Sequence, residues 1–594
     1  MATLSLETLH YDVVIIGAGG AGLRAAVAAA EQRSKVAVLS KSLLGKAHTV
    51  MAEGGIAAAL GNLDPYDSWD THFYDTMVSG HFINNYQMVE IYTKEAPARI
   101  FELENWGAVF DRTEDGKILQ RPFGAHSFRR LAHVGDRTGK ELIRTLQYKV
   151  LSLDVDIFQE VTSTRLFVDD EGRIAGVFAY RRDDGQPLVF RAKSLILATG
   201  GWGRMYRVTS NSWESTGDGC ALALWLGAEV QDMEMIQFHP TGMVWPPGVR
   251  GILVTEGVRG EGGLLFNSEN ERFMLRYDPV RQELSSRDVV SRSIFKEVAL
   301  GRGSPHGGAW LDIRHRGAQY VKQKLPGMYD QFLKLADVDI TRERFEVGPT
   351  VHYTMGGIRV QAATGATNIE GLYAAGETAA GLHGANRLGG NSLGDLLVFG
   401  RRAGMAAAEY AKARAKWPQL AKNQIEAERK RIVQPFTIES GTNPFMVQET
   451  LQALMTAHVG IMRSKQSLTT AMEQFQALRA DVERMAASGP IHFNPGWNTI
   501  FDVQSLIILA ESVIQGAIAR EESRGAQWRV DFPEELADLG RVNFVQRLSP
   551  GKGLSIEARP IPAMPESLAR LFRASAAPGV LRAREEQRHL AKEE

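Results

Sequence analysis

The sequence predicts an α/β protein in which a parallel sheet is interrupted by an inserted domain and followed by a bundle of helices. Three observations lead to this prediction. A glycine-rich turn joins an apolar strand to a helix near the N-terminus, buried strands return at residues 194–201 and 371–377, and apolar residues recur at helical spacing after about residue 413. With 594 residues, the chain is also long enough for several domains.

The first strand, turn and helix are predicted to bind a dinucleotide. Residues 13–16 have the length and β-branching of a buried parallel strand, and Gly17, Gly19 and Gly22 complete the pattern G-x-G-x-x-G before an alanine-rich helix. The first glycine of this pattern allows a tight turn, the second lets backbone N–H groups approach a pyrophosphate, and the third lets helix and strand pack closely. The helix N-terminus adds the positive end of its dipole. A purely structural glycine turn is the less favoured alternative.

The end of the second predicted strand bears on the choice of dinucleotide. Nicotinamide-binding folds place an acidic residue about 20 residues after the glycines, where it holds the ribose hydroxyls. Here the strand at residues 35–39 ends in Ser40 and Lys41. This departure weakens the case for a nicotinamide cofactor and leaves FAD open.

The composition excludes several classes of function. A net charge of -1 gives no basic field for nucleic acid and no polybasic patch for a membrane surface. The N-terminus does not resemble a signal peptide, and no uncharged apolar run reaches the roughly 18 residues of a membrane span, so we expect a cytoplasmic or peripheral protein. Cys220 is the only cysteine, so this chain alone cannot build a cysteine-ligated iron–sulfur cluster. Any relay of single electrons is therefore expected in another subunit.

The order of strands and helices predicts the domain boundaries. Residues 157–193 have the pattern of an antiparallel meander, and from residue 239 to 351 the alternation of strands and helices lapses, which indicates an insertion. We predict a discontinuous Rossmann-like domain, an inserted α+β capping domain, a helical bundle and a small C-terminal domain. Their predicted ranges are 1–238 with 352–412, 239–351, 413–528 and 529–594.

Several His and Arg residues lie in glycine-rich motifs in and around the predicted insertion. They occur in QFHPTG, VTEGVRGEGG, SSRDVV, HYTMGG and HGANRLGG, and the candidates are His239, Thr255, Glu256, Arg259, Arg287, His352 and Arg387. Guanidinium, imidazole and hydroxyl donors at such positions suit a small dianion, since each carboxylate accepts charge-assisted hydrogen bonds. The set therefore predicts a dicarboxylate substrate. Taken singly, each histidine is better explained as structural and each arginine as a surface ion pair.

Together with IGAGGAG, SK followed by HT and GGIAAAL, QRPFG, ATGG and TGDG, these motifs resemble the flavoprotein subunit of succinate dehydrogenase and quinol:fumarate reductase from the first strand to about residue 411. The resemblance implies FAD joined through its 8α-methyl to His48. The FAD contacts that it implies are Gly17, Ala18, Gly19, Gly20, Ala21, Gly22, Ser40, Lys41, His48, Thr49, Glu53, Gly54, Gly55, Asp218, Glu377, Ser392 and Leu393. Lys46 and Ala47 replace the Arg-Ser that is usual before the histidine.

The resemblance also implies how a dicarboxylate is bound and converted. Arg287 is expected to exchange a proton with the substrate, relayed through Glu256 and Arg259. The implied substrate contacts are Phe123, His239, Thr255, Glu256, His352 and Arg387. No metal site is implied.

The same resemblance implies a membrane-associated complex that interconverts succinate and fumarate. Its implied partners are a membrane anchor with a quinone site and an iron–sulfur subunit, and the implied location is peripheral, on the cytoplasmic side of the cell inner membrane. One alternative is a soluble L-aspartate oxidase, against which His48 argues, and another is a catalytically silent flavin-binding protein, against which the complete set of His and Arg residues argues.

Glu53 is typical of fumarate reductases at its position, and Val258 replaces a cysteine that many members carry.

Overall fold

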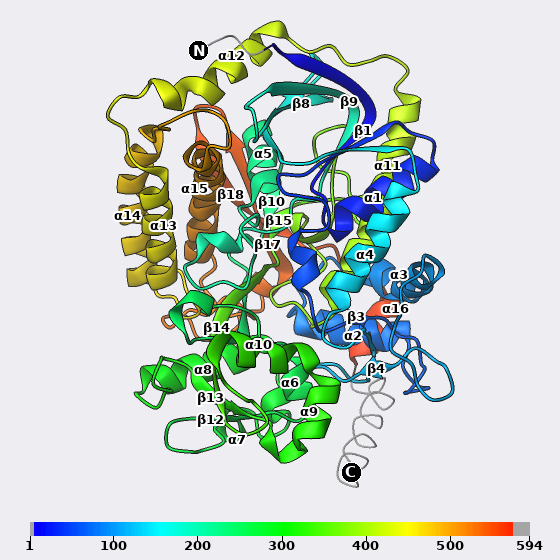
Figure 1. Cartoon of the computed structure of the whole chain (residues 1–594), viewed down its shortest axis with the longest axis vertical. Coiled ribbons are helices and arrows are strands. Elements are labelled where there is room, and N and C mark those ends of the chain that lie inside the picture. The colour runs from blue at the N-terminus through cyan, green and yellow to red at the C-terminus, as the bar shows by residue number, and fades with distance from the viewer. Residues whose placement is uncertain (1–4, 574–594) are drawn as a thin grey trace.

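The computed structural model describes residues 5–573 and is built around a mainly parallel sheet (Figure 1). The parallel strands have the order β6–β2–β1–β9–β16. Their bounds are β1 (Glu7–Ile16), β2 (Val36–Leu39), β6 (Val155–Phe158), β9 (Pro187–Leu197) and β16 (Leu372–Ala374). The strand, glycine turn and helix expected at the N-terminus are present, with α1 (Gly20–Glu31) starting directly after the turn.

Alternate residues of β1 face two different hydrophobic cores, as the two-residue period of a strand requires. Val13 and Ile15 pack with α1, and Val14 and Ile16 pack on the opposite side. The helices on the first side are α2 (Trp69–Ser79), α3 (Tyr86–Asn105), α4 (Thr138–Leu151) and α11 (Asn391–Ala413), and α5 (Asp218–Leu226) lies on the second. Burial on both faces explains why residues 13–16 are uniformly apolar.

The predicted meander shares a strand with the parallel sheet. β7 (Val161–Val168) and β8 (Ile174–Arg181) are antiparallel, and β8 pairs with the first half of β9. The last meander strand and the core strand predicted at 194–201 are therefore one strand, since β9 pairs along β1 throughout its length. The sequence suggested two strands because polar residues occur near the middle of this run.

The insertion is a separate antiparallel sheet with helices, in the lower part of Figure 1. Its sheet has the order β11–β14–β13–β12. The strands are β11 (Ile236–Met243), β12 (Leu264–Phe266), β13 (Ala309–Asp312) and β14 (Phe345–Thr354), and the helices are α6 (Gly257–Gly260), α7 (Met274–Tyr277), α8 (Arg287–Ala299), α9 (Ala318–Lys324) and α10 (Pro326–Ala336). The chain enters on β11 and leaves on β14, which are paired.

The predicted helical bundle is present, mostly on the left of Figure 1, with its first helix at the top. It consists of α12 (Lys422–Val433), α13 (Pro444–His458), α14 (Lys465–Glu483) and α15 (Pro495–Ala519). Within residues 5–573, α15 alone is long and apolar enough to cross a membrane, but 72% of its apolar window is buried inside the protein. This burial is what the core helix of a globular domain shows.

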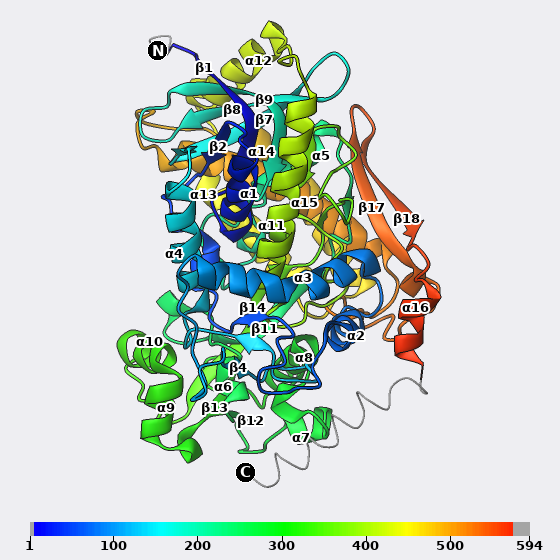
Figure 2. The ribbon, with the colours of Figure 1, turned by 90° about the vertical axis from the view of Figure 1, so that its right-hand side faces the viewer.

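The C-terminal hairpin, on the right of Figure 2, completes a sheet begun much earlier in the chain. β17 (Val542–Ser549) and β18 (Gly553–Pro560) continue a sheet with β10 (Val230–Gln231) and β15 (Gly357–Ile358). α16 (Glu566–Ala569) follows the hairpin, and residues 574–594 of the predicted C-terminal domain lie outside the described residues. A small sheet of β3 (Ile56–Ala57), β4 (Gln120–Arg121) and β5 (Leu131–Ala132) lies beside α11.

Candidate active site

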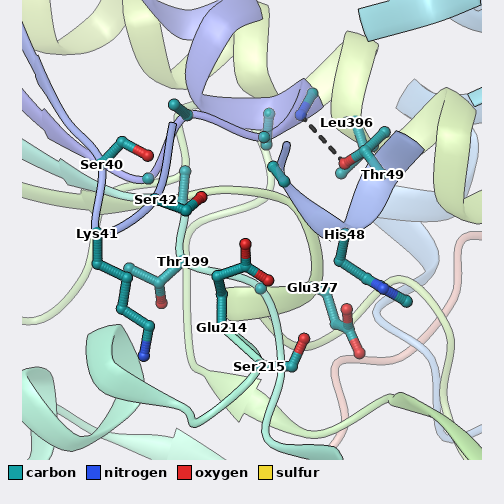
Figure 3. A pocket seen from close by; sticks show the side chains of 18 of the residues that line it. Ser40, Lys41, Ser42, His48, Thr49, Thr199, Glu214, Ser215, Glu377 and Leu396 are labelled. Atoms are coloured by element: carbon teal, nitrogen blue, oxygen red, sulfur yellow. Dashed lines mark hydrogen bonds between the residues drawn. The ribbon is translucent and has the colours of Figure 1, made fainter. Parts of the chain in front are cut away.

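The glycine turn opens into a pocket with about 1280 Å³ of empty space (Figure 3). Gly17 has a φ of +113° and a Cβ there would lie 2.1 Å from the carbonyl oxygen of Ala198, while a Cβ on Gly22 would lie 1.9 Å from that of Gly17. Both positions therefore exclude a side chain. A Cβ on Gly19 would meet only side-chain atoms of Thr49 and Ala47, the nearer at 3.4 Å, so this glycine leaves room for an approaching ligand.

Thirteen of the seventeen predicted FAD contacts line this pocket. They are Gly17, Ala18, Gly19, Gly20, Ala21, Ser40, Lys41, His48, Thr49, Asp218, Glu377, Ser392 and Leu393. Ser40 and Lys41 lie at one end, and His48 and Glu377 at the other (Figure 3). The pocket thus combines the glycine turn with polar groups at two ends, as a dinucleotide site requires.

Four predicted FAD contacts do not line the pocket: Gly22, Glu53, Gly54 and Gly55. Gly22 packs on the turn, and a Cβ on Gly54 would lie 2.5 Å from the ring of Phe123. Gly54 therefore makes room for a predicted substrate contact. Burial, with the nearby charge of Asp136, raises the pKa of Glu53 well above its ordinary value, and Glu53 Oε2 has no hydrogen-bond partner among the described residues.

Lys41 is tied to the helical bundle. Its Nζ lies 2.9 Å from Asp218 Oδ2 and 2.9 Å from Asp502 Oδ1, and Asp502 belongs to α15. Although burial opposes the charge, the two carboxylates raise the pKa of Lys41. The sequence assigned no chemistry to the bundle, yet α15 helps to hold a residue of the nucleotide pocket.

His48 begins a short 3-10 turn, and both of its ring nitrogens have neighbours. The backbone N–H of Ser212 donates to Nδ1 over 3.2 Å, and Asn211 Nδ2 lies 3.3 Å from Nε2. Burial lowers the pKa of His48 to about 4. The imidazole is therefore neutral at physiological pH, with Nδ1 as its hydrogen-bond acceptor.

Glu377 follows the carboxyl end of β16, where ligands of parallel sheets bind. Its Oε1 accepts hydrogen bonds from Thr354 N (3.0 Å) and Thr354 Oγ1 (3.3 Å). Burial raises the pKa of Glu377 to about 7.

The three predicted catalytic residues form one buried ionic chain. Arg287 Nε donates to Glu256 Oε2 over 2.8 Å, and Arg259 Nη2 lies 3.7 Å from the same oxygen. Glu256 Oε1 accepts from the backbone N–H of Gly124 over 2.7 Å, so the loop after Phe123 contacts the insertion here. Burial opposes ionisation, but Arg287 and Arg259 lower the pKa of Glu256. The structure thus brings all three predicted relay residues together.

His239 and His352 come from the two strands by which the chain enters and leaves the insertion. The pairing of β11 with β14 skips His352, which makes it a bulge residue, and the two imidazole rings lie 5.1 Å apart. Bulges re-aim side chains near active sites. Ser210 Oγ lies 2.8 Å from His352 Nδ1, and burial lowers the pKa of both histidines well below its ordinary value.

Arg387 links this cluster to the start of α11. Its Nη1 donates to Ser392 Oγ over 2.6 Å, and its guanidinium lies 4.3 Å from the centre of the Tyr353 ring. Burial, together with the positive charge of Arg287, lowers the pKa of Arg387 to about 9. Thr255 is also buried, and Phe123 lies with its ring centre 6.0 Å from the Arg287 guanidinium.

Matches to known proteins extend over nearly the whole chain. Residues 12–393 match a family model described as FAD binding domain, and residues 448–560 match one described as fumarate reductase flavoprotein C-term. A chain of the CoM/CoB fumarate reductase of Methanothermobacter marburgensis is 45% identical, over 91% of this chain and 98% of the relative. The succinate dehydrogenase flavoprotein subunit of Coxiella burnetii is 39% identical, over 89% and 93%. This chain belongs to the family of succinate dehydrogenase and fumarate reductase flavoprotein subunits.

Solved structures agree with this family. The structure of Mycobacterium smegmatis Sdh1 in complex with UQ1 has a TM-score of 0.87 and 48% identity, and the match covers 96% of this chain and 98% of that chain. The predicted fold class, the resemblance and the use of FAD are confirmed. The protein is an FAD-dependent oxidoreductase of the succinate dehydrogenase and fumarate reductase class. L-Aspartate oxidase, the alternative from the sequence, is not favoured by these relatives.

Three residues that the sequence prediction missed lie among the predicted ones: Gln237, Ser210 and Tyr353. Gln237 was discoverable, because it lies two residues before His239 in QFHPTG, on the same face of a strand. Tyr353 follows His352 directly in its motif. Ser210 lies in no recognised motif, so its contact with His352 could not be expected from the sequence.

We expect the holoenzyme to resist thiol reagents. Val258 lies between Glu256 and Arg259, where a cysteine would place a thiol in the active site, and a valine offers no thiol to modify. Val258 and Cys220 are both fully buried, and burial raises the pKa of the Cys220 thiol, which keeps it protonated and unreactive. Activity measured during incubation with N-ethylmaleimide should stay constant. Rapid inactivation that malonate prevents, with no label on Cys220, would contradict this expectation.

Proposed function

We propose that this chain is the catalytic flavoprotein subunit of a membrane-associated succinate:quinone or quinol:fumarate oxidoreductase, with FAD attached to His48 and Arg287 as the proton donor. The observation that carries the proposal is the buried cluster of Arg287, Glu256 and Arg387, in which Arg387 donates to Ser392 of the pocket lining. Such a cluster supports the assignment of a proton donor and carboxylate-binding groups near the dinucleotide site.

The charge of the cluster fits a dicarboxylate. Arg259, Arg287 and Arg387 are cations and Glu256 is the one anion among these four groups, so two positive charges remain uncompensated. The histidines are neutral, because burial lowers the pKa of His239 and His352. A dianion with two carboxylates, such as succinate or fumarate, supplies the missing negative charge and satisfies buried donors that have no partner among residues 5–573, including Arg387 Nε.

The residues of the pocket fit FAD. The glycine turn at Gly17 excludes side chains, and the N-terminus of α11 contributes Ser392 and Leu393 to the lining. Backbone N–H groups at such a terminus stabilise negative charge. When bound, FAD supplies the chemistry of hydride exchange with the substrate.

Arg287, Glu256 and Arg259 are proposed to transfer the proton to and from the substrate. In fumarate reduction, Arg287 delivers a proton from its guanidinium to one alkene carbon. Before the transfer, Glu256 accepts a hydrogen bond from Arg287 Nε and stabilises the positive charge of the guanidinium. Guanidinium is a weak acid in water. Here Glu256 and Arg259 share the change in charge in a site with almost no exposed surface, and water is excluded. Succinate oxidation reverses the transfer.

His48 is the residue proposed for covalent attachment. Nδ1 accepts from the Ser212 N–H, so Nε2, which lies 3.3 Å from Asn211 Nδ2, would lose its proton and form the bond to the 8α-methyl. A neutral imidazole is required for this bond, and the lowered pKa of about 4 keeps His48 neutral.

A membrane anchor with a quinone site and an iron–sulfur subunit complete the proposed enzyme. Cys220 is the only cysteine of the chain, so an electron relay needs ligands from another polypeptide. We place the complex on the cytoplasmic side of the inner membrane. Purification from membranes without a tag on any partner, followed by identification of the co-purified subunits and dye-linked assays with succinate and fumarate, tests this proposal. A chain that purifies alone and oxidises L-aspartate would overturn it.

We expect noncovalent FAD binding to depend on Glu377. Hydroxyl donors of the ribose or ribityl chain favour the carboxylate, whereas burial raises the pKa of Glu377 to about 7. Binding therefore releases a proton, and affinity rises with pH until about pH 7. For His48→Ser, which cannot form the bond, FAD affinity should be about tenfold lower at pH 6 than at pH 8. The double variant with Glu377→Gln should lose this dependence, and a persistent pH dependence would exclude Glu377 as its source.

A further inference from the structure

Gln237 lies between the two arginines of the cluster. Its Oε1 accepts a hydrogen bond from Arg287 Nη1 over 3.1 Å and another from Arg387 Nη2 over 3.1 Å. The side chain leaves β11 two residues before His239, and Gln237 is 1% exposed. One carbonyl oxygen thus joins a guanidinium of the insertion to a guanidinium of the loop before α11.

The orientation of this amide is fixed by its other contacts. Gln237 Nε2 donates to Asn386 Oδ1 over 2.8 Å and to the Arg387 carbonyl oxygen over 2.8 Å. Asn386 is held in turn, because its Nδ2 donates to Asp288 Oδ1 over 3.1 Å. The amide uses both of its donors and both lone pairs, and a flipped amide would point its N–H groups at two cations.

A neutral acceptor has a specific advantage here. A glutamate in place of Gln237 would have similar shape but would neutralise a guanidinium charge that the substrate needs, and it could not donate to Asn386 or to the Arg387 carbonyl. The amide holds both guanidiniums by hydrogen bonds and leaves their charges available. Arg287 keeps its second contact, with Glu256, on Nε.

We propose that Gln237 is a positioning residue that sets the separation of the proton-donating Arg287 from the carboxylate-binding Arg387, and that its neutrality preserves the affinity of the site for a dianion. The inference rests on the proposed dicarboxylate function. It predicts that charge at this position matters beyond shape, which a merely structural glutamine would not require.

Malonate binding by calorimetry tests the inference, using the FAD-containing protein and the variants Gln237→Glu and Gln237→Met. The carboxylate should repel the ligand and weaken binding by roughly 100-fold. Methionine removes only hydrogen bonds and should weaken it by roughly tenfold. Gln504→Glu is the matched control, because Gln504 Oε1 also accepts from an arginine, Arg431 Nη1 over 2.8 Å, but lines a different pocket. It should bind malonate normally.

The pH dependence of fumarate reduction gives a second readout. A carboxylate beside Arg287 stabilises its cation, so Gln237→Glu should lower kcat and move the alkaline limb of the profile to higher pH. Gln237→Met should lower kcat without that movement. Melting temperature and bound FAD show that each variant is folded, and binding is measured below the lowest melting temperature.

The outcomes separate this inference from the proposed function. If the unmodified protein binds malonate but both Gln237 variants bind it equally well, the positioning role is wrong and the dicarboxylate site stands. If Gln237→Glu and Gln237→Met weaken malonate binding equally, the neutral charge of Gln237 has no role in affinity. If the unmodified protein binds no dicarboxylate, the proposed function and this inference fall together.

Discussion

Replacing Arg287 with alanine is expected to lower kcat for fumarate reduction and succinate oxidation by about 10⁴-fold or more, while FAD remains attached. In the proposed mechanism both directions depend on the same proton, and water would not substitute for the guanidinium in a site where Glu256 and Arg259 are 2% exposed. Loss of an interaction made only in the transition state lowers kcat, whereas loss of a uniform binding contact raises KM. Malonate should still bind, though more weakly, because His239, His352 and Arg387 remain while one positive charge of the cluster is lost.

Two further variants separate proton transfer from binding. Arg287→Lys keeps a positive charge but cannot donate hydrogen bonds to Glu256 and Gln237 at the same time. It should therefore bind malonate but turn over as slowly as the alanine variant. Arg387→Ala should instead weaken malonate binding, by roughly 100-fold. Arg316→Ala, on the exposed surface of the same inserted domain, is the control and should behave normally. Substantial turnover in Arg287→Ala with only a raised KM would make Arg287 another carboxylate ligand.

Local patterns predicted the elements that hold the site, because their causes are local. The apolar run at residues 13–16 and the glycines after it report burial on both faces and a tight turn within a few residues. The helical spacing after residue 413 reports one buried face per helix. The boundary between the meander and β9 was missed because one strand changes partners along its length, and the sequence does not record partners.

Contacts between distant residues explain what the sequence could not predict. Asp502 binds Lys41 across 461 positions, and Gln237 accepts from Arg387 across 150. No periodicity connects such pairs. Gly54 was predicted from the resemblance as an FAD contact, and the structure adds that it lies beside the ring of Phe123. A motif thus indicates that a residue is needed near the site, whereas its partner becomes evident only when the chain is folded.

His48→Ser is expected to leave FAD bound but extractable by acid. The glycine turn, Glu377 and the start of α11 do not depend on His48, so the noncovalent contacts persist. The denatured variant should show no flavin fluorescence on a gel, whereas the unmodified chain and His315→Ser, a change at an exposed histidine, should both fluoresce. Fluorescence that stays with the denatured His48→Ser chain would place the attachment at another residue.

The same variant should also change the balance between the two directions of catalysis. An imidazole bonded to the ring withdraws electrons and raises the flavin potential, which favours acceptance of a hydride from succinate, a poor reductant. Without it, succinate oxidation should fall at least about tenfold more than fumarate reduction, which corresponds to a two-electron potential lowered by roughly 30 mV. Potentiometric titration of the bound flavin measures the shift independently of turnover. An unchanged potential with an unchanged ratio of rates would mean that the bond only retains the cofactor, and that His48 has no part in setting the direction of the reaction.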